Sequence, residues 1–149
     1  MKVLKRISII IPGDPVGKGR PRFVRATGRT YTPEKTSRYE NFVRMAFCDK
    51  YPDHVPIDGA VDLTIRAYFK IPESWPKWKK EFGRTELMKR TSKPDADNIV
   101  KSVCDGLNNV AWKDDAQIAD LTTRKRYSDR PRVEIEIMYD EEEPDGGDK

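Results

Sequence analysis

Hydrophobic residues recur with two different periods along the 149-residue chain, and these periods predict the order of its elements. Alternating or β-branched runs predict strands over residues 3–11, 61–69, 117–127 and 131–139. Helical spacing predicts helices over residues 33 to about 50, 74 to about 89 and 98 to about 107. This order indicates one α/β (α+β) domain, with helices packed on a four-stranded mixed or antiparallel sheet.

Local signals refine the boundaries of these elements. Thr32 is an expected helix N-cap, with Pro33 at the first helical position. The Gly and Pro residues of segment 12–32 predict a loop without regular structure. Gly83 is an expected break in the helix that starts at residue 74. Residues 128–130 are the expected turn of an antiparallel hairpin formed by the last two strands.

The composition excludes several classes of protein. No apolar run approaches the ~20 residues that span a bilayer, so we expect no membrane association. Two cysteines, Cys48 and Cys104, are too few for a disulfide framework or a four-cysteine zinc site. The one histidine, His54, excludes a His-rich metal site within one chain. The expected compartment is therefore the reducing cytoplasm.

Charge is distributed unevenly along the chain. The net charge is +4, but residues 140–149 carry six acids and one lysine, which leaves +9 on residues 1–139. Residues 1–50 alone hold twelve Lys or Arg and four acids. An excess of clustered positive charge favours a polyanion partner, and nucleic acid is the commonest. We expect residues 1–139 to form the domain and residues 140–149 to be a disordered acidic tail.

Segment 13–19 has the glycines and the lysine of a phosphate-binding loop but not their spacing. No Ser or Thr follows Lys18, and Pro21 blocks the helix that would cradle a phosphate, so we expect no nucleotide cofactor. The loop favours contact with a DNA backbone instead, because its cations have no acids among them; a solvated surface loop is the alternative. The five cations are Lys18, Arg20, Arg22, Arg25 and Arg29.

The strongest candidates for catalysis are acids around residue 97. Asp95 and Asp97 are expected on one side of an extended segment, with Asp97 capping the helix that follows. At ~100° per residue, one helix edge is polar and the opposite face is apolar. The polar edge carries Asp97, Lys101 and Asp105, and the apolar face carries Ile99, Val103 and Leu107.

Paired carboxylates repel each other unless a cation lies between them, and Mg²⁺ prefers carboxylate oxygens. A second acidic pair, Asp114 and Asp115, precedes a predicted strand. Oxygen ligands beside Lys101 suit metal-assisted hydrolysis of a phosphodiester. The structural alternative is that Asp97 is only a helix cap, Asp105 a solvated acid and the second pair a polar turn.

Both acidic segments, residues 95–101 and 112–117, resemble the RusA family of Holliday-junction resolvases. The family pattern is D-x-D-N-x-x-K-x-x-x-D-x-L, followed after a short spacer by D-D-x-Q, and every fixed element of it is present. Residues 12–22 and 31–33 resemble the phage and prophage branch of the family. The resemblance runs from about residue 7 to residue 137.

The resemblance implies an α/β homodimer that cuts four-way DNA junctions symmetrically with Mg²⁺, for which Mn²⁺ can substitute. It implies paired metal-binding catalytic acids at Asp95 and Asp97, a third at Asp115, and a catalytic lysine at Lys101. Asp114 and Asp105 are secondary candidates. Residues 75–90 form an insert that shorter members of the family largely lack.

The leading hypothesis is a metal-dependent endodeoxyribonuclease that resolves recombination junctions, with branched DNA as its partner. A second hypothesis is a non-catalytic DNA-junction-binding module, which would explain the basic loop. A third is a nuclease acting mainly on forks or flaps, which the sequence does not separate from the first. Trp75 and Trp78 of the insert are expected to be core or interface anchors rather than a DNA-stacking platform.

Overall fold

The computed structural model describes residues 1–19, 22–31 and 33–143. For Arg22–Val24 and Tyr31 it describes the backbone but not the side chains. Its strands are β1 (Lys2–Pro12), β2 (Arg22–Val24), β3 (Arg29–Tyr31), β4 (Val61–Lys70), β5 (Ile118–Ser128) and β6 (Arg132–Glu142). Its helices are α1 (Glu34–Lys50), α2 (Lys77–Gly83) and α3 (Ala96–Leu107), with a short 3-10 turn, η1 (Asp115–Gln117). Among these residues, none of the helices has both the length and the apolar content needed to cross a bilayer.

Four strands form one mixed sheet in the order β1-β6-β4-β5, which confirms the predicted α+β class. β6 is antiparallel to β1 and β4, whereas β5 runs parallel to β4. The predicted hairpin of the last two strands is therefore wrong, because β4 lies between β5 and β6. β4 is the more buried strand and takes the central place, while β5 carries consecutive Arg and Lys residues that suit an edge.

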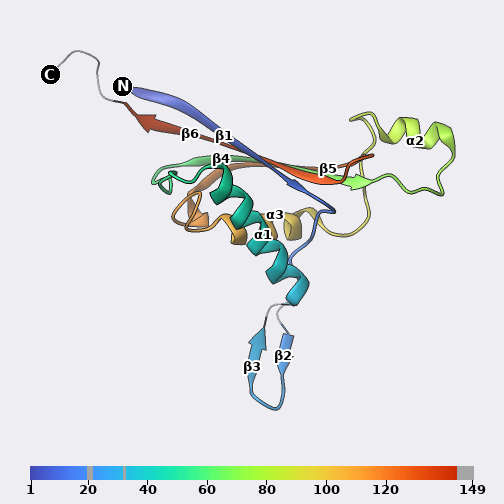
Figure 1. Cartoon of the computed structure of the whole chain (residues 1–149), viewed down its shortest axis with the longest axis horizontal. Helices are drawn as coiled ribbons and strands as arrows, with labels where there is room; N and C mark the ends of the chain where they lie inside the picture. The colour runs from blue at the N-terminus through green and yellow to red at the C-terminus, as the bar shows by residue number, and fades with distance from the viewer. Residues whose placement is uncertain (20–21, 32, 144–149) are drawn as a thin grey trace.

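One face of the sheet is covered by α1 and α3, which lie on the same side of it (Figure 1). β1, β4 and β6 alternate buried and more exposed residues over most of their length, so the apolar set of each of these strands points to the helices. The fully buried residues of this core include Ile11, Leu63, Ile65, Ile135, Ile137, Val43, Phe47, Ile99, Val103, Leu107 and Trp112. The predicted apolar face of α3 is confirmed by its three fully buried members.

The segment between β1 and α1 differs from its prediction. It is not wholly irregular, because β2 and β3 pair as a small hairpin, and Gly28 in its turn has φ +67°, a backbone conformation that favours glycine. The hairpin projects beyond the first turn of α1 (Figure 1). Pro33 is the residue before α1 rather than its first residue, and the expected cap, Thr32, lies outside the described residues.

The insert and the chain end also depart from the expected boundaries. The helix expected over residues 74–89 is limited to α2. Trp75 is confirmed as a core anchor, since its ring meets Tyr127 at 4.8 Å, but Trp78 is 68% exposed. At the chain end, β6 continues through residues 140–142, which pair with β1 instead of belonging to a tail. Residues 144–149 lie outside the described part of the chain.

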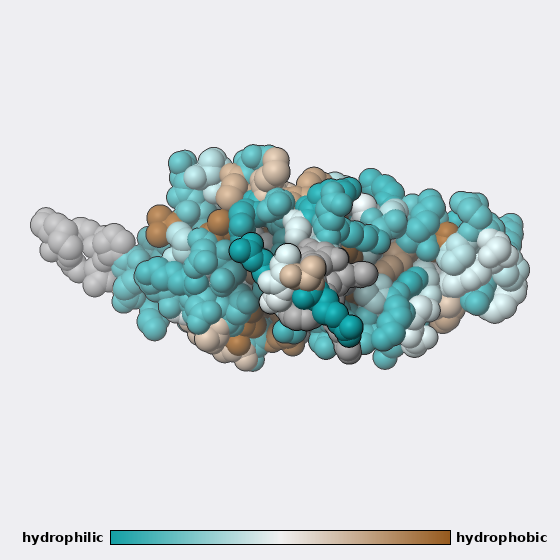
Figure 2. Space-filling model, turned by 90° about the horizontal axis from the view of Figure 1, so that it is seen from below, coloured by the Kyte–Doolittle hydropathy of each residue, from teal (hydrophilic) through white to brown (hydrophobic). Residues whose placement is uncertain are grey.

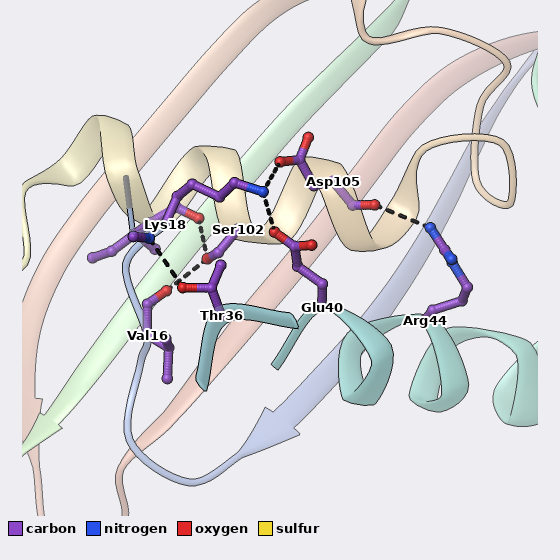
Figure 3. Close-up of polar contacts among 9 residues, drawn as sticks. Val16, Lys18, Thr36, Glu40, Arg44, Ser102 and Asp105 are labelled. Atoms are coloured by element: carbon purple, nitrogen blue, oxygen red, sulfur yellow. Dashed lines mark hydrogen bonds and ion pairs between the residues drawn. The ribbon is translucent and has the colours of Figure 1, made fainter. Parts of the chain in front are cut away.

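Residues 16–19 form a strap that ties α1 to α3 (Figure 3). The Lys18 ammonium reaches Glu40 of α1 at 2.7 Å and Asp105 of α3 at 2.8 Å. Burial lowers the pKa of Lys18, but the two carboxylates outweigh this effect and raise it overall, so the ammonium stays charged. The backbone of the strap is fixed as well, because Val16 O accepts a hydrogen bond from Ser102 Oγ at 2.6 Å.

Removing the Lys18 cation tests how much this bridge stabilises the fold. We expect Lys18→Met to lower the free energy of unfolding by about 1–3 kcal/mol, because two partly buried carboxylates lose a shared donor. Urea denaturation would measure the change. Glu40→Gln added to Lys18→Met should restore part of the loss, since it removes one of the two unpaired charges.

Arg38→Met is the matched control, because Arg38 pairs with Glu34 on the exposed side of α1. An exposed i,i+4 pair contributes about 0.5 kcal/mol or less. Equal losses in Lys18→Met and Arg38→Met would show that the bridge has no special role.

Candidate active site

The two acids of the D-x-D motif stand at the start of α3. Asp95 occupies the N-cap position and Asp97 lies in the first turn, so the prediction that Asp97 caps the helix is wrong. The Asp95 side chain makes no capping hydrogen bond; its carboxylate instead pairs with Lys93 at 2.9 Å. The predicted extended segment carrying both acids is also wrong, because the helix begins between them.

Along α3, Lys101 and Asp105 follow Asp97 at intervals of one turn. Asp97 and Lys101 are exposed, and Asp105 is 40% exposed. The predicted polar edge is thus confirmed. The Asp105 carboxylate is nevertheless not free, because it forms an ion pair with the Lys18 ammonium.

Asp115 comes to the site from the loop before β5. Its carboxylate accepts a hydrogen bond of 2.7 Å from the indole N–H of Trp112, whose side chain is fully buried. Gln117 fixes the same loop through both its amide oxygen and its amide nitrogen. Its Oε1 accepts from the backbone N–H of Asp114 at 2.8 Å, and its Nε2 donates to Ile57 O at 2.6 Å. The D-D-x-Q motif therefore holds Asp115 in one place.

The electrostatics of Asp115 show which charges surround it. Burial raises the pKa of Asp115, and the charges of Asp105 and Asp114 raise it further. The Trp112 hydrogen bond and the Lys101 ammonium act in the opposite direction. The fold thus brings Asp115 within electrostatic reach of Lys101 and Asp105 of α3.

Asp95 has different surroundings from Asp115. Its charge acts on Lys125 of β5, whose pKa is lowered mainly by burial, then by Arg90, while Asp95 opposes the shift. Sequence reasoning missed the contribution of Trp112, although a tryptophan three residues before an acid was visible in the motif. It also missed the ion pair of Asp95 with Lys93, which is adjacent to Pro94 in the sequence.

The five cations of the predicted basic loop do not all form one exposed surface in the described part of the chain. Arg25 and Arg29 are exposed on the β2–β3 hairpin. Lys18, expected to be a free DNA-binding cation, is instead held in the bridge between α1 and α3. Arg20 lies outside the described residues, and the side chain of Arg22 is not described.

The donor set fits a hard divalent cation in its chemistry. All of the candidate ligands are carboxylates, and a cation would offset the burial and the charges of Asp105 and Asp114 that raise the Asp115 pKa. As the side chains stand in the described ranges, no three His, Cys, Asp or Glu residues converge as a ready-made metal cage. The carboxylates therefore supply ligand type and charge, but not a closed coordination shell.

Asp97 and Lys101 stand one turn apart on α3, and Asp115 lies close enough to Lys101 for its pKa to be affected. Carboxylates beside a lysine are the residue types that metal-assisted phosphodiester hydrolysis uses. The chain matches the family described as "Endodeoxyribonuclease RusA" over residues 12–138, and it belongs to that family. It is therefore an endodeoxyribonuclease. It is also 37% identical over 135 residues to the uncharacterised protein YqaN of Bacillus subtilis (strain 168), covering 88% of this chain and 94% of YqaN.

The Trp112 hydrogen bond gives a pH test of the site. Trp112→Phe keeps an aromatic ring but removes the indole N–H that stabilises ionised Asp115. We expect the Asp115 pKa to rise, so that the acidic limb of the cleavage rate against pH moves to higher pH. The measurement is cleavage rate across the pH range, at a temperature where unfolding curves show the variant folded.

Trp78→Phe provides the comparison, because Trp78 is 68% exposed and lies on α2. It should leave the acidic limb in place. If Trp112→Phe also leaves the limb in place, ionisation of Asp115 does not control cleavage.

Proposed function

We propose that this endodeoxyribonuclease resolves four-way Holliday junctions by paired, Mg²⁺-dependent phosphodiester hydrolysis in recombination and repair. The observation that supports the proposal is the electrostatic effect of Lys101 and Asp105 of α3 on Asp115, within a chain of the RusA family. A non-catalytic junction-binding module is a poorer fit, because acids facing DNA weaken binding unless a cation lies between them. The cytoplasm is the matching compartment.

Asp95, Asp97 and Asp115 are the residues that would hold the metal. A bound Mg²⁺, or Mn²⁺ in its place, supplies Lewis acidity and charge neutralisation at the phosphate. The chain itself contributes positioning, because Trp112 and Gln117 fix Asp115 against the edge of α3. Lys101 offers an exposed ammonium that stabilises negative charge developing on phosphate oxygens.

DNA contact by the β2–β3 hairpin belongs to the same proposal. Arg25 and Arg29 are exposed on a segment that projects from the domain, so both guanidinium groups are accessible to a phosphate backbone. Arg20 and Arg22 stay sequence-based candidates. Lys18 is held between Glu40 and Asp105, so it is not a free cation for DNA.

Substitution of the acids tests the catalytic roles. We expect Asp97→Asn and Asp115→Asn to reduce cleavage by orders of magnitude while junction binding survives or tightens, because each removes one negative ligand at constant size. The assay is cleavage of labelled four-way, fork and flap DNA with and without Mg²⁺. Preference for forks or flaps would favour the third hypothesis, and full cleavage by both variants would contradict the metal site.

Stability measurements separate chemistry from folding. The folded-state pKa of Asp115 is raised, so its stabilising contribution is complete at pH below the unfolded-chain pKa and is lost as pH rises through the folded pKa. Asp115→Asn should therefore retain or raise the melting temperature at pH 7. Asp97→Asn should cost about 0.3–1 kcal/mol by removing an acid from the first helical turn. Asp49→Asn, an exposed acid on α1, is the control for both.

We also propose that the active form is a homodimer. A four-way junction needs two cuts related by symmetry, and two sites in a C2 dimer match this requirement. The sheet face away from α1 and α3 carries exposed apolar residues such as Leu4 and Ile10, which a partner could cover.

The mass in solution checks this proposal. Light scattering at micromolar concentration should give twice the 17.3 kDa of one chain. A mass of one chain, with junction resolution intact, would contradict it.

A further inference from the structure

A basic groove lies at the start of α3, where Ala96 is part of its lining. It has a volume of about 370 Å³ and is bounded by the end of the insert and by the edge strand β5. We call it the β5-edge groove, and its charged and polar lining includes Lys89, Arg90, Thr123, Arg124, Lys125 and Arg126. No acidic side chain is present among the described residues that line it.

The insert builds one wall of this groove through hydrogen bonds to β5. The Arg90 backbone N–H donates to Lys125 O at 3.1 Å, and the Arg126 side chain donates to Glu86 O at 2.8 Å. Lys125 Nζ in turn donates to Ser92 O at 2.6 Å. These bonds hold the cations of the insert against those of β5.

The positive charges of the groove are not neutralised within it. Burial, followed by the nearby Arg90, lowers the pKa of Lys125, as expected where cations crowd one another. The charge of Asp95 offsets the lowered Lys125 pKa only in part, and the Asp95 carboxylate is itself paired with Lys93; the Glu86 carboxylate accepts the Tyr68 hydroxyl. An anion in the groove would relieve this repulsion.

The floor of the groove also has unused hydrogen-bonding capacity. Arg90 Nε and Thr123 Oγ1 are buried and have no hydrogen-bond partner among the described residues. The Arg90 guanidinium stacks on the Phe69 ring at 4.0 Å, which fixes its plane. The wall is accessible in contrast, because Lys89 and Arg124 are exposed.

We propose that the β5-edge groove binds the phosphate backbone of a DNA arm next to the scissile phosphate. The inference rests on the proposed function, which makes DNA the substrate. Ala96 lines the groove and stands between Asp95 and Asp97, so a backbone held there passes directly beside the acid pair. The groove also gives the insert a role: it supplies Lys89 and Arg90, which extend the DNA-binding surface beyond the β2–β3 hairpin.

Charge removal from the exposed wall tests the groove. The test variant is Lys89→Gln with Arg124→Gln, which alters neither the core nor the catalytic acids. The matched control is Lys2→Gln with Arg6→Gln, which removes the same charge from β1, the opposite edge of the sheet. Binding of fluorescein-labelled duplex and four-way DNA is measured without Mg²⁺ over a range of salt concentrations.

We expect the slope of log affinity against log salt to fall by about two units in the test variant and to stay unchanged in the control. Bound DNA should also protect Lys89, but not Lys2, from acetylation, as read by mass spectrometry. Equal salt slopes in the two variants, or equal acetylation of Lys89 and Lys2 in the presence of DNA, would contradict DNA binding in the β5-edge groove.

The same experiment separates failure of the groove from failure of the proposed function. The test variant can show a smaller salt slope on duplex DNA while the wild-type protein cuts no junction. In that case DNA binding in the groove is supported and junction resolution is contradicted. If the wild-type protein cuts junctions and both variants bind DNA with the same salt slope, junction resolution is supported and DNA binding in the groove is contradicted. Absence of any DNA binding by the wild-type protein would overturn both.

Discussion

The close contact between α1 and α3 at Gly106 is the constraint on which the site depends. A Cβ atom at this position would lie 2.9 Å from Glu40 O and 2.9 Å from Val43 Cβ, so only glycine permits this approach. Arg44 of α1 reinforces the contact by donating to the carbonyl of Asp105 (Figure 3) and to that of Gly106. With α3 fixed in rotation, its apolar face is buried and its acidic edge is directed away from the sheet.

The strap extends this control over the whole length of α3. Near the end of the helix, Lys18 binds Asp105; near its start, the Lys18 backbone N–H donates to Asn98 O at 2.8 Å. Gly17 contacts Pro94 so closely that a Cβ atom would lie 2.6 Å from the Pro94 Cβ. The strap therefore fixes both ends of the helix that carries the candidate catalytic residues, and it neutralises one of the acids that raise the Asp115 pKa.

The sequence predicted what depends on local periodicity and missed what depends on distant partners. The buried and exposed faces of α3 follow from a 3.6-residue repeat, so Ile99 and Lys101 were placed correctly. Lys18 was interpreted as a surface cation because its partners, Glu40 and Asp105, lie far away in the chain. The β5–β6 hairpin was wrong for a related reason: a short turn favours pairing of its flanking strands, but insertion of β4 between them is decided by core packing.

The distribution of charge follows from the conflict between a carboxylate site and a polyanionic substrate. Seen from the side of the helices and the hairpin, the surface is mostly hydrophilic, with small separate apolar patches (Figure 2), so that DNA bound on this side would meet mainly polar groups. On the proposed function, cations at the hairpin and the β5-edge groove would attract phosphates, whereas the candidate acids would repel phosphates until a cation binds. The strap sets the position of α3, and the hairpin that carries the first basic surface lies between the strap and α1 in the sequence. The hydrogen bonds between the insert and β5 hold together the cations of the second basic surface, the β5-edge groove. On the proposed function, the fold would thus separate attraction of the DNA from its cleavage, and a metal bound at the acids would connect the two.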